Sequence, residues 1–599
     1  MNNNPLNTNK NASSSKNRSR RHLSAGYLIK RLCKYLFCHK LLLLLAFILM
    51  IGSNLLALLG PFLSGLAVDA VAKEGGVDFN SVFLYCALML GVYILSAVLS
   101  YVLTIVMTTV SKRVTFSMRK DVFTHLAHLP VSYYDTNQTG DIISRISYDI
   151  DTINASLSHD ILQIGASLIT VAGSFIMMCT INANLLVIFA VTVPITVLFT
   201  KYKTKKVQPL FKKRSESLGR LNGYAEEMMS ALRTVKVYGS EKSVLQKFDD
   251  YNSKAVTAYY QADYHACAVG PGVNFVNNLS LALVSVLGSL LYLFERISLG
   301  DISSFILYSR KFSVPINEMA NIISELQSAL AASDRMFSLL DEPVEREDSP
   351  NALCLTSPRG DVSIKNVDFS YDKAKKIIQD LTIDVKAGQV VAIVGPTGAG
   401  KTTVINLLMR FYDPDTGEIH IDGSNIQDVT RKSLRKSFTM VLQDTWLFSG
   451  TVYENIAYGK ENATLDDVIA VAKKAKIHSF IEKLPDGYNT VLTDDGQGIS
   501  KGQKQLITIA RAMLNDSSLL ILDEATSNVD SRTEIRISDA MTDLMKGKTC
   551  FIIAHRLSTV KNADMIIVMG QGKISEIGTH EQLLKNKGAY YDIYTSQFR

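Results

Sequence analysis

Apolar and polar positions divide this chain into two parts with different patterns. Between Leu41 and Leu326, long apolar runs alternate with polar stretches, and most runs have the roughly 20 residues that a helix needs to cross a membrane. After Leu340, short β-like runs alternate with amphipathic helical segments, as in layered α/β domains. The pattern therefore predicts an all-α membrane domain followed by an α/β domain.

Six apolar runs are candidate membrane-spanning helices. The fourth run is short, and residues 182–184 alone separate it from the third, so these two runs predict a tight helical hairpin. The six runs are Leu41–Leu66, Val82–Val110, Ile161–Ile181, Leu185–Thr200, Val273–Phe294 and Ile302–Leu326.

Two stretches between the apolar runs are long but keep a helical pattern. They cover Ser111–Asp160 and Lys201–Gly270 and contain few helix breakers. Because long structureless connections are uncommon in compact proteins, we expect the membrane helices to continue into the cytosol here. Pro130 interrupts the first stretch, and the short turn at Tyr133–Asp141 is expected to lie against a cytosolic domain and to transmit its motion.

The charges of the loops predict the orientation. Lysine and arginine cluster at the end of the second run and after the fourth, whereas the opposite loops carry mainly acids. Because cytoplasmic loops are rich in Lys and Arg, we expect both termini and the α/β domain to be cytoplasmic, with the helices in the plasma membrane. The cations are Lys112, Arg113, Arg119, Lys120, Lys201, Lys203, Lys205, Lys206, Lys212, Lys213 and Arg214, and the acids are Asp69, Glu74, Asp78, Glu295 and Asp301.

Several polar and charged residues lie inside the last two apolar runs. Charge at membrane depth is costly and usually faces a cavity or a partner group. Two interpretations stay open: these residues line a substrate-translocation cavity, or they form hydrogen bonds and ion pairs between helices. If Arg310 and Lys311 line the cavity, acidic or zwitterionic cargo is favoured. The set comprises Asn274, Asn277, Asn278, Arg310, Lys311, Asn317, Glu318 and Asn321.

Composition argues against two other classes of protein. The net charge of +7 comes without a clustered basic, aromatic-rich face, which argues against nucleic-acid binding. The seven cysteines are scattered and show no CxxC spacing, which argues against a disulfide framework or a zinc site. Residues 1–22 are basic and rich in Asn and Ser, so we expect a disordered cytosolic tail that either has no role or contacts membrane lipids. Trp446 is expected to pack in the core.

The segment Gly395–Thr402 carries the first chemical motif. It matches GxxxxGK[ST], follows an apolar strand at Val390–Val394 and precedes a helical pattern. Glycines let backbone N–H groups close around phosphates, and the N-terminus of a helix favours negative charge. Lys401 would neutralise the β- and γ-phosphates of a nucleotide, and Thr402 would bind Mg²⁺. The motif therefore predicts an ATP site.

A second apolar strand, Leu519–Leu522, ends in two acids. Asp523 suits Mg²⁺ binding, and Glu524 suits polarising the water that attacks the γ-phosphate. Two adjacent carboxylates are weak evidence alone, and they gain weight from the phosphate-binding motif in the same domain.

Together these segments resemble the ABC transporters, specifically the exporters in which six membrane helices precede one ATP-binding cassette. Further motifs follow in the order typical of that family. Tyr371 matches the aromatic residue that stacks on adenine, Gln443 matches the glutamine that reaches Mg²⁺ and water, and His555 matches the switch histidine. Ile499–Gln503 occupies the place of the Leu-Ser-Gly-Gly-Gln signature, and Tyr134–Arg145 resembles the first coupling helix and the residues after it.

The resemblance implies a set of site residues. The catalytic residues would be Glu524, His555 and Gln443, and the Mg²⁺ ligands would be Thr402, Gln443 and Asp523. The ATP contacts would be Tyr371, Gly395, Pro396, Thr397, Gly398, Ala399, Gly400, Lys401, Thr402, Thr403, Ser500, Lys501, Gly502, Gln503 and Asp530.

It also implies a division into domains and a partner. The expected parts are the tail at 1–22, the transmembrane domain at 23–340, a linker at 341–360 and the cassette at 361–599. In this family two cassettes pack head to tail, and each ATP lies between the phosphate loop of one chain and the signature of the other. A second half-transporter is therefore expected, and ATP binding and hydrolysis would switch the membrane helices between inward- and outward-facing states.

One departure from the family pattern affects the choice of partner. Lys501 replaces the first signature glycine, Ile499 replaces the leucine, and Asp494–Gly498 lacks the usual Gly-Glu-Arg-Gly stretch. Such a chain resembles the subunit of heterodimeric exporters that keeps its catalytic acids but has an altered signature. The altered signature therefore favours a heterodimer. Alternatively, Lys501 points to solvent without effect, so a homodimer stays open.

We therefore expect an ATP-hydrolysing exporter of amphipathic drugs, lipids or peptides. The main alternative is an ATP-gated regulator or channel that keeps the architecture without pumping. Asp523, Glu524 and His555 favour turnover, because a regulator does not need the full catalytic set. The fusion of membrane domain and cassette argues, by resemblance, against an importer subunit.

Overall fold

The computed structural model describes residues 24–73, 76–372, 375–443, 445–492, 498–523, 530–554 and 560–596, without the side chains of residues 317 and 319–321. The chain forms two compact units. The helical unit contains the residues up to Ala127 and Thr139–Glu342, and the α/β unit contains His128–Gln138 and the residues from Pro343 onward. The expected basic tail lies outside the described residues.

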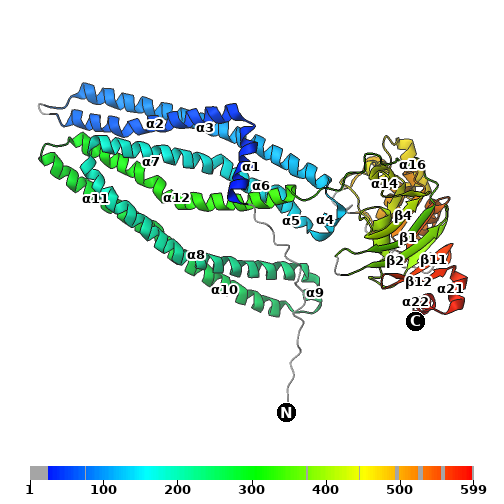
Figure 1. The fold of residues 1–599 in the computed structure, drawn as a ribbon. Coiled ribbons are helices and arrows are strands. Elements are labelled where there is room, and N and C mark those ends of the chain that lie inside the picture. Colours follow the sequence, from blue (N-terminus) through cyan, green and yellow to red (C-terminus); the bar gives the residue numbers. More distant parts are fainter. Residues whose placement is uncertain are drawn as a thin grey trace, which may run out of the picture. The chain divides into compact units, whose positions relative to one another are not determined.

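The helical unit consists of long helices joined by short turns (Figure 1). Its helices are α1 (Ala25–Phe37), α2 (Lys40–Val71), α3 (Phe79–Ala127), α5 (Thr139–Ser144), η1 (Arg145–Asp149), α6 (Ile150–Ala155), η2 (Ser156–Asp160), α7 (Ile161–Ile181), η3 (Ala183–Leu185), α8 (Leu186–Ser230), α9 (Leu232–Val237), α10 (Glu241–Cys267), α11 (Val269–Leu293) and α12 (Leu299–Leu340).

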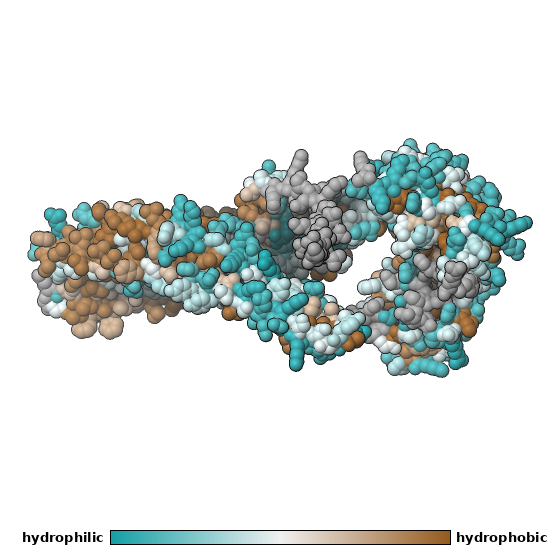
Figure 2. Space-filling model, turned by 90° about the horizontal axis from the view of Figure 1, so that it is seen from below, coloured by the Kyte–Doolittle hydropathy of each residue, from teal (hydrophilic) through white to brown (hydrophobic). Residues whose placement is uncertain are grey.

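The predicted all-α membrane domain is confirmed. Five helical stretches among the described residues are long and apolar enough to cross a membrane. Apolar side chains gather on the surface over one part of the helical unit in Figure 2, and those exposed on α3 include Phe83, Leu84 and Ile94. The sixth predicted run forms α12, whose charged residues lower its hydropathy. The five stretches are Lys40–Val71, Phe79–Ala127, Thr139–Ile181, Ala183–Ser230 and Glu241–Leu293.

The connecting stretches are helical, as the sequence predicts. Helix α3 continues without a break through Ser111 for 49 residues, and α8 extends for 45 residues. The predicted hairpin between α7 and α8 is the single turn η3. Asn182 caps this turn, because its side-chain oxygen accepts a hydrogen bond from the backbone N–H of Asn184 at 2.9 Å.

Polar contacts hold α2 against α12. The Tyr308 hydroxyl donates to the Leu58 carbonyl at 2.6 Å, and the Lys311 ammonium donates to the Ala57 carbonyl at 2.8 Å. Pro61 has no N–H, so the Ala57 carbonyl four residues earlier lacks its intrahelical donor. Lys311 supplies that donor from α12, which supports inter-helix bonding for this residue. Arg310 is exposed.

The α/β unit has a six-stranded sheet and a four-stranded sheet (Figure 1). The first has the order β12-β11-β3-β10-β9-β6, and the second has the order β2-β1-β4-β5. Their strands are β1 (Val362–Phe369), β2 (Ile378–Val385), β3 (Val390–Val394), β4 (Thr416–Ile421), β5 (Ser424–Asn425), β6 (Phe438–Val441), β9 (Leu519–Asp523), β10 (Thr549–Ile553), β11 (Met565–Gly570) and β12 (Lys573–Gly578).

Helices and a small hairpin complete this unit. The hairpin pairs β7 (Gly450–Thr451) with β8 (Val491–Leu492). The helices are α4 (Val131–Thr136), α13 (Lys401–Leu408), α14 (Arg431–Lys436), α15 (Val452–Ala457), α16 (Leu465–Lys474), α17 (His478–Ile481), η4 (Gly487–Asn489), α18 (Lys501–Leu514), α19 (Ser531–Met545), α21 (His580–Asn586) and α22 (Ala589–Ser596).

The core of the α/β unit lies on both faces of the six-stranded sheet. In β3, Ala392 and Val394 belong to one apolar cluster, whereas Val391 and Ile393 belong to the other. All four side chains are buried. A strand that is buried on both faces reads as a continuous apolar run, which is why the sequence identifies it without alternation.

Candidate nucleotide-binding site

The turn after β3 has a backbone that requires glycine. Gly395, Gly398 and Gly400 have φ angles of +151°, +83° and +99°. A Cβ on Gly395 would lie 2.2 Å from the Met569 carbonyl oxygen, and one on Gly400 would lie 2.7 Å from Cδ1 of Ile378. Side chains are therefore excluded at both positions. Gly400 is also the N-cap of α13 and offers no side chain to the first N–H groups of that helix, so these donors are available to an anion.

Lys401 lies under this turn. Its side chain is buried, and its ammonium donates to the carbonyl oxygens of Gly395 at 2.7 Å and Pro396 at 3.1 Å. Burial lowers the pKa of Lys401, and the negative charge of Asp523 opposes that shift. Thr402 is exposed, whereas Thr403 is buried. The residues of the sequence motif therefore form a loop, and the Lys401 ammonium is held at the base of this loop.

Five strands of the six-stranded sheet are parallel, and β3, β10, β9 and β6 are the four of them that place the predicted site residues at one edge. Strand β10 pairs with β3 and with β9, and Ile553 is level with both Ile393 and Asp523. Strand β6 pairs with β9, and Val441 is level with Leu522. Ligands of open α/β sheets bind beyond such carboxyl ends. The phosphate loop, Asp523 and the segment that begins at Leu442 therefore share one edge.

Two predicted catalytic residues follow these strand ends directly. Glu524 comes after β9, and His555 comes after β10 with one residue between. Both lie outside the described residues. The segment Ser527–Asp530 resembles the family's loop that contacts the partner cassette, and Asp530 alone of this segment is described. The Asp530 side chain caps α19 by accepting a hydrogen bond from the Thr533 N–H at 3.0 Å, and the hydrogen bonds that the Asp530 carboxylate accepts lower its pKa.

Tyr371 is placed beside the phosphate-loop helix. Its hydroxyl donates to the Thr403 hydroxyl oxygen at 3.3 Å and accepts from the Asn406 amide at 3.2 Å, and 48% of the residue is exposed. The rings of Phe369 and Tyr412 contact it edge-on, with centroids 4.8 Å and 4.9 Å away. Neither Phe369 nor Tyr412 stands in a motif that binds phosphate, so the sequence alone does not identify them as supporting residues.

The signature segment forms the start of a helix. The Ser500 hydroxyl accepts from the Gln503 N–H at 3.3 Å, and the Gln503 side-chain oxygen accepts from the Ser500 N–H at 2.9 Å. This capping box fixes the first turn of α18. Gly502 is buried, and Lys501 is exposed at the first helical position. The backbone of the segment is therefore regular despite the lysine.

Gln443 and Trp446 lie in the exposed segment after β6. Gln443 is exposed, and Trp446 is 63% exposed. The expectation that Trp446 packs in the core is therefore wrong. Its backbone carbonyl accepts from the Arg511 guanidinium at 3.1 Å, which fixes the main chain and leaves the indole outside. Trp446 begins a run of three apolar residues with Leu447 and Phe448, and of these three only Leu447 is buried.

A helical unit with apolar spans, joined in one chain to an α/β unit with a phosphate loop at the carboxyl ends of its strands, defines a nucleotide-driven membrane transporter subunit. Comparison with known proteins identifies the family of this chain. Residues 43–316 match the family model of the ABC transporter transmembrane region, and residues 378–527 match the ABC transporter model. The chain belongs to the ABC transporter family, as a half-transporter in which one transmembrane domain is fused to one cassette.

Several relatives cover nearly the whole chain. The uncharacterized ABC transporter ATP-binding protein YfiC of Bacillus subtilis is 42% identical over 570 residues, covering 95% of this chain and 94% of the relative. A fatty acid ABC transporter ATP-binding/permease protein of Mycobacterium bovis is 43% identical over 524 residues, covering 87% and 83%. The structure of a bacterial Atm1-family ABC exporter with ATP bound matches with a TM-score of 0.75 at 31% identity, over 92% of this chain and 97% of that one.

The comparisons confirm the predicted class. The chain is an integral membrane protein and an exporter subunit of the Atm1 and multidrug type, its cassette binds ATP, and ATPase activity is expected of it.

Proposed function

We propose that this chain couples pairing of two cassettes and ATP hydrolysis to outward movement of amphipathic substrates. The observation that carries the proposal is the common edge of β3, β10, β9 and β6. Because this edge joins the phosphate loop to Asp523 and to the segment of Gln443, one site can hold the phosphates, a metal ion and the attacking water.

Each residue has a distinct role in this proposal. Lys401 leaves its two carbonyl partners and neutralises the β- and γ-phosphates, while the N–H groups of the glycine turn surround them. Tyr371 stacks on adenine with its exposed face. Glu524 polarises the attacking water, and His555 contacts the γ-phosphate. The remaining loop residues Pro396, Thr397, Gly398, Ala399 and Thr403 shape the phosphate loop, and Ser500, Lys501, Gly502, Gln503 and Asp530 meet the partner cassette.

The donor set fits Mg²⁺. The exposed Thr402 hydroxyl, the Asp523 carboxylate at the end of β9 and the exposed Gln443 amide are hard oxygen donors, and Mg²⁺ prefers such donors together with phosphate oxygens. When bound, Mg²⁺ would neutralise charge that develops on the phosphates. Asp523 also lies close enough to Lys401 to act on its charge, so these two residues face one site.

The partner is proposed to be a different half-transporter. The exposed Lys501 at the first turn of α18 would meet the ATP that the partner's phosphate loop holds, and a lysine Cβ prevents the close approach that glycine allows. This chain would then supply its catalytic acids to an active site and its altered signature to a weak site. The alternative is a homodimer that tolerates Lys501.

The cargo is proposed to be an amphipathic drug, lipid or peptide, taken from the plasma membrane with the cassette on the cytoplasmic side. The mycobacterial relative is named for fatty acids, which supports an amphipathic cargo. The division into a tail at 1–22, a transmembrane domain at 23–340, a linker at 341–360 and a cassette at 361–599 is part of the same proposal.

ATPase activity of the chain purified alone in lipid nanodiscs tests the proposal. The Glu524→Gln variant is the control, because it keeps nucleotide binding and removes the group that polarises the water. Low activity that rises on co-expression of a second half-transporter would support the heterodimer, and high activity that the variant abolishes would support a homodimer. Transport that persists in Glu524→Gln would contradict the coupling of hydrolysis to export and favour a regulator or channel.

A further inference from the structure

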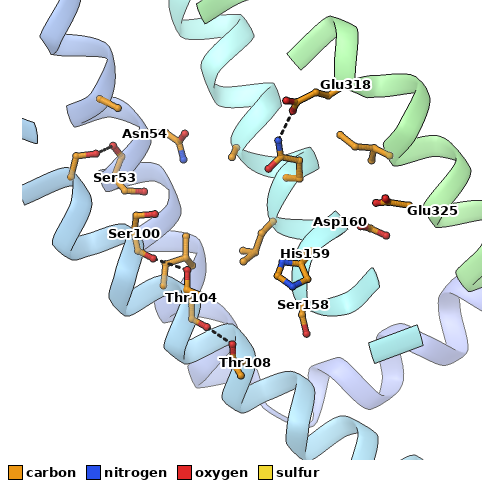
Figure 3. Close-up of a pocket in the computed structure, with 17 residues that line it drawn as sticks. Ser53, Asn54, Ser100, Thr104, Thr108, Ser158, His159, Asp160, Glu318 and Glu325 are labelled. Atoms are coloured by element: carbon orange, nitrogen blue, oxygen red, sulfur yellow. Dashed lines mark hydrogen bonds between the residues drawn. The ribbon is translucent and has the colours of Figure 1, made fainter. Parts of the chain in front are cut away.

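The helical unit contains a polar cavity of about 670 Å³ that no sequence motif marks (Figure 3). Helices α2, α3, α7 and α12 and the turn η2 line it. Arg310 and Lys311 are not among its lining residues, and Lys311 is engaged by the Ala57 carbonyl. The inference that these two cations select acidic cargo therefore does not apply to this cavity.

One side of the cavity is acidic. Asp160 is 5% exposed, and no N–H or hydroxyl group in the described part of the chain donates to its Oδ2 atom. Glu325 of α12 lies beside it in Figure 3. Glu318, about two turns before Glu325 on α12, accepts a hydrogen bond from the Gln163 amide at 2.8 Å. A buried carboxylate oxygen without a donor is costly unless a cation or a donor from outside the chain reaches it.

The opposite side offers oxygen acceptors. The Thr104 hydroxyl donates to the Ser100 carbonyl at 3.0 Å, and the Thr108 hydroxyl donates to the Thr104 carbonyl at 2.8 Å, as drawn in Figure 3. Each hydroxyl has one hydrogen, so the lone pairs of both oxygens remain available to the cavity. The described lining residues of α2 and α3 carry no charge, and the lining includes no lysine or arginine. The carboxylates of the lining therefore make the electrostatic potential in the cavity negative.

The backbone next to Asp160 is irregular. The turn η2, which supplies Ser158, His159 and Asp160 to the cavity, is π-helical and interrupts the helix between α6 and α7. Such π-turns are costly within a helix and occur frequently at functional sites. Here the π-turn brings three consecutive residues to the cavity wall.

We propose that this cavity binds the charged group of an amphipathic organic cation, with Asp160 and Glu325 as its counter-charges. The proposal rests on the exporter function above and narrows its substrate class. A bound cation gives the Asp160 oxygen a partner and reduces the electrostatic repulsion between the two neighbouring carboxylates. A fatty acid would bring a third carboxylate to the same place, so it is disfavoured at this cavity.

Binding of tetraphenylphosphonium to the nanodisc-embedded full chain tests the proposal. We expect Asp160→Asn and Glu325→Gln each to weaken binding about tenfold, because each removes a charge that contacts the cation. Asp249→Asn, at an exposed acid of α10 outside the cavity, is the matched control and should bind as the unchanged chain does. Equal affinity in all four proteins would overturn the proposal.

A second measurement on the unchanged chain guards against misfolded variants. Tetraphenylphosphonium should bind to the unchanged chain more tightly than laurate, because the carboxylates of the cavity attract a cation and repel another carboxylate. Laurate binding that is stronger than that of the cation and competes with it would overturn the proposal. ATP hydrolysis, measured on the chain alone and co-expressed with a second half-transporter, separates the outcomes. Hydrolysis in either sample without cation binding rejects this cavity alone, whereas no hydrolysis in both samples rejects the exporter function.

Discussion

The Tyr412 hydroxyl donates a hydrogen bond to the Asp135 carboxylate at 2.6 Å, across 277 positions of sequence. Burial and the neighbouring Asp135 raise the pKa of Tyr412, so the phenol keeps its proton and remains a donor. The Tyr412 ring also contacts Tyr371 edge-on. One tyrosine thus links α4 to the side chain that lies beside the phosphate-loop helix.

Replacing Tyr412 with phenylalanine should uncouple the substrate response from ATP hydrolysis. The ring contacts remain, but the hydrogen bond to a charged group is lost, which is worth about 1.5–3 kcal/mol. We expect basal ATPase activity within about twofold of the unchanged chain and a loss of most stimulation by substrate. Asp135→Asn keeps an acceptor oxygen and should retain more stimulation. Full stimulation in Tyr412→Phe would show that this bond does not transmit motion.

Removing Arg335 should destabilise the helical unit. Its guanidinium donates to both oxygens of Asp149, at 3.1 Å and 3.0 Å from Nε, and Asp149 is 2% exposed. Arg335→Ala leaves a buried carboxylate unpaired, so we expect a loss on the order of 3 kcal/mol in the free energy of unfolding, measured by denaturant titration in detergent.

The chain supplies its own comparison for this measurement. Arg119 forms an ion pair with Asp151, with 2.5 Å between Nη2 and Oδ1. The Arg119 side chain is 45% exposed and the Asp151 side chain is 60% exposed. Arg119→Ala should cost about 0–1 kcal/mol, because solvent screens such pairs. Equal losses in the two variants would mean that burial of Asp149 does not set the cost.

Lys401→Ala should weaken ATP binding and abolish turnover. The buried ammonium is the cation at the base of the phosphate loop, and a charge-assisted contact to phosphate is worth at least about tenfold in affinity. Fluorescent ATP-analogue binding measures the effect. Lys501→Ala, at an exposed lysine of the signature, should leave binding to the isolated chain unchanged. If both variants bind ATP normally, the assignment of Lys401 fails.

Cys550 should resist alkylation while Cys354 reacts. Burial raises the pKa of the Cys550 thiol to about 12, so near pH 8 it carries almost no thiolate, which is the reactive form. Cys354 lies on the same unit and is exposed. Maleimide labelling followed by peptide mass spectrometry should modify Cys354 in native protein and Cys550 only after unfolding. Labelling should begin at higher pH for Cys550, since the deprotonated fraction grows with pH. Rapid native labelling of Cys550 near pH 8 would contradict its burial.

Much of the fold could be predicted because its signals are local. Apolar runs identified the membrane helices, residues 182–184 identified the hairpin, and the glycines of the phosphate loop identified backbone angles that other residues avoid. The strand before that loop and the strand before Asp523 were equally clear, because a doubly buried strand is a short continuous apolar run.

The remaining features depend on contacts between distant segments. Asp160 stands at the end of a polar stretch with a helical pattern, and its role at a cavity wall depends on α12 and on a π-turn that has no sequence signature. Tyr412 follows the phosphate-loop helix without a motif, and its partner Asp135 is far away in sequence. Lys311 suggested cargo recognition, but its acceptor on α2 exists because a proline stands one turn further along that helix.

That proline has a consequence for how the chain can change over time. An alanine at position 61 would restore the N–H, and the Ala57 carbonyl would return to its own helix. Lys311 would then lack its acceptor within the membrane domain, at a cost of roughly 2.5–3.5 kcal/mol for an ammonium at membrane depth. Positions 61 and 311 are therefore expected to be replaced together among descendants of this chain. A helix-forming residue at position 61 should occur together with a neutral residue at position 311.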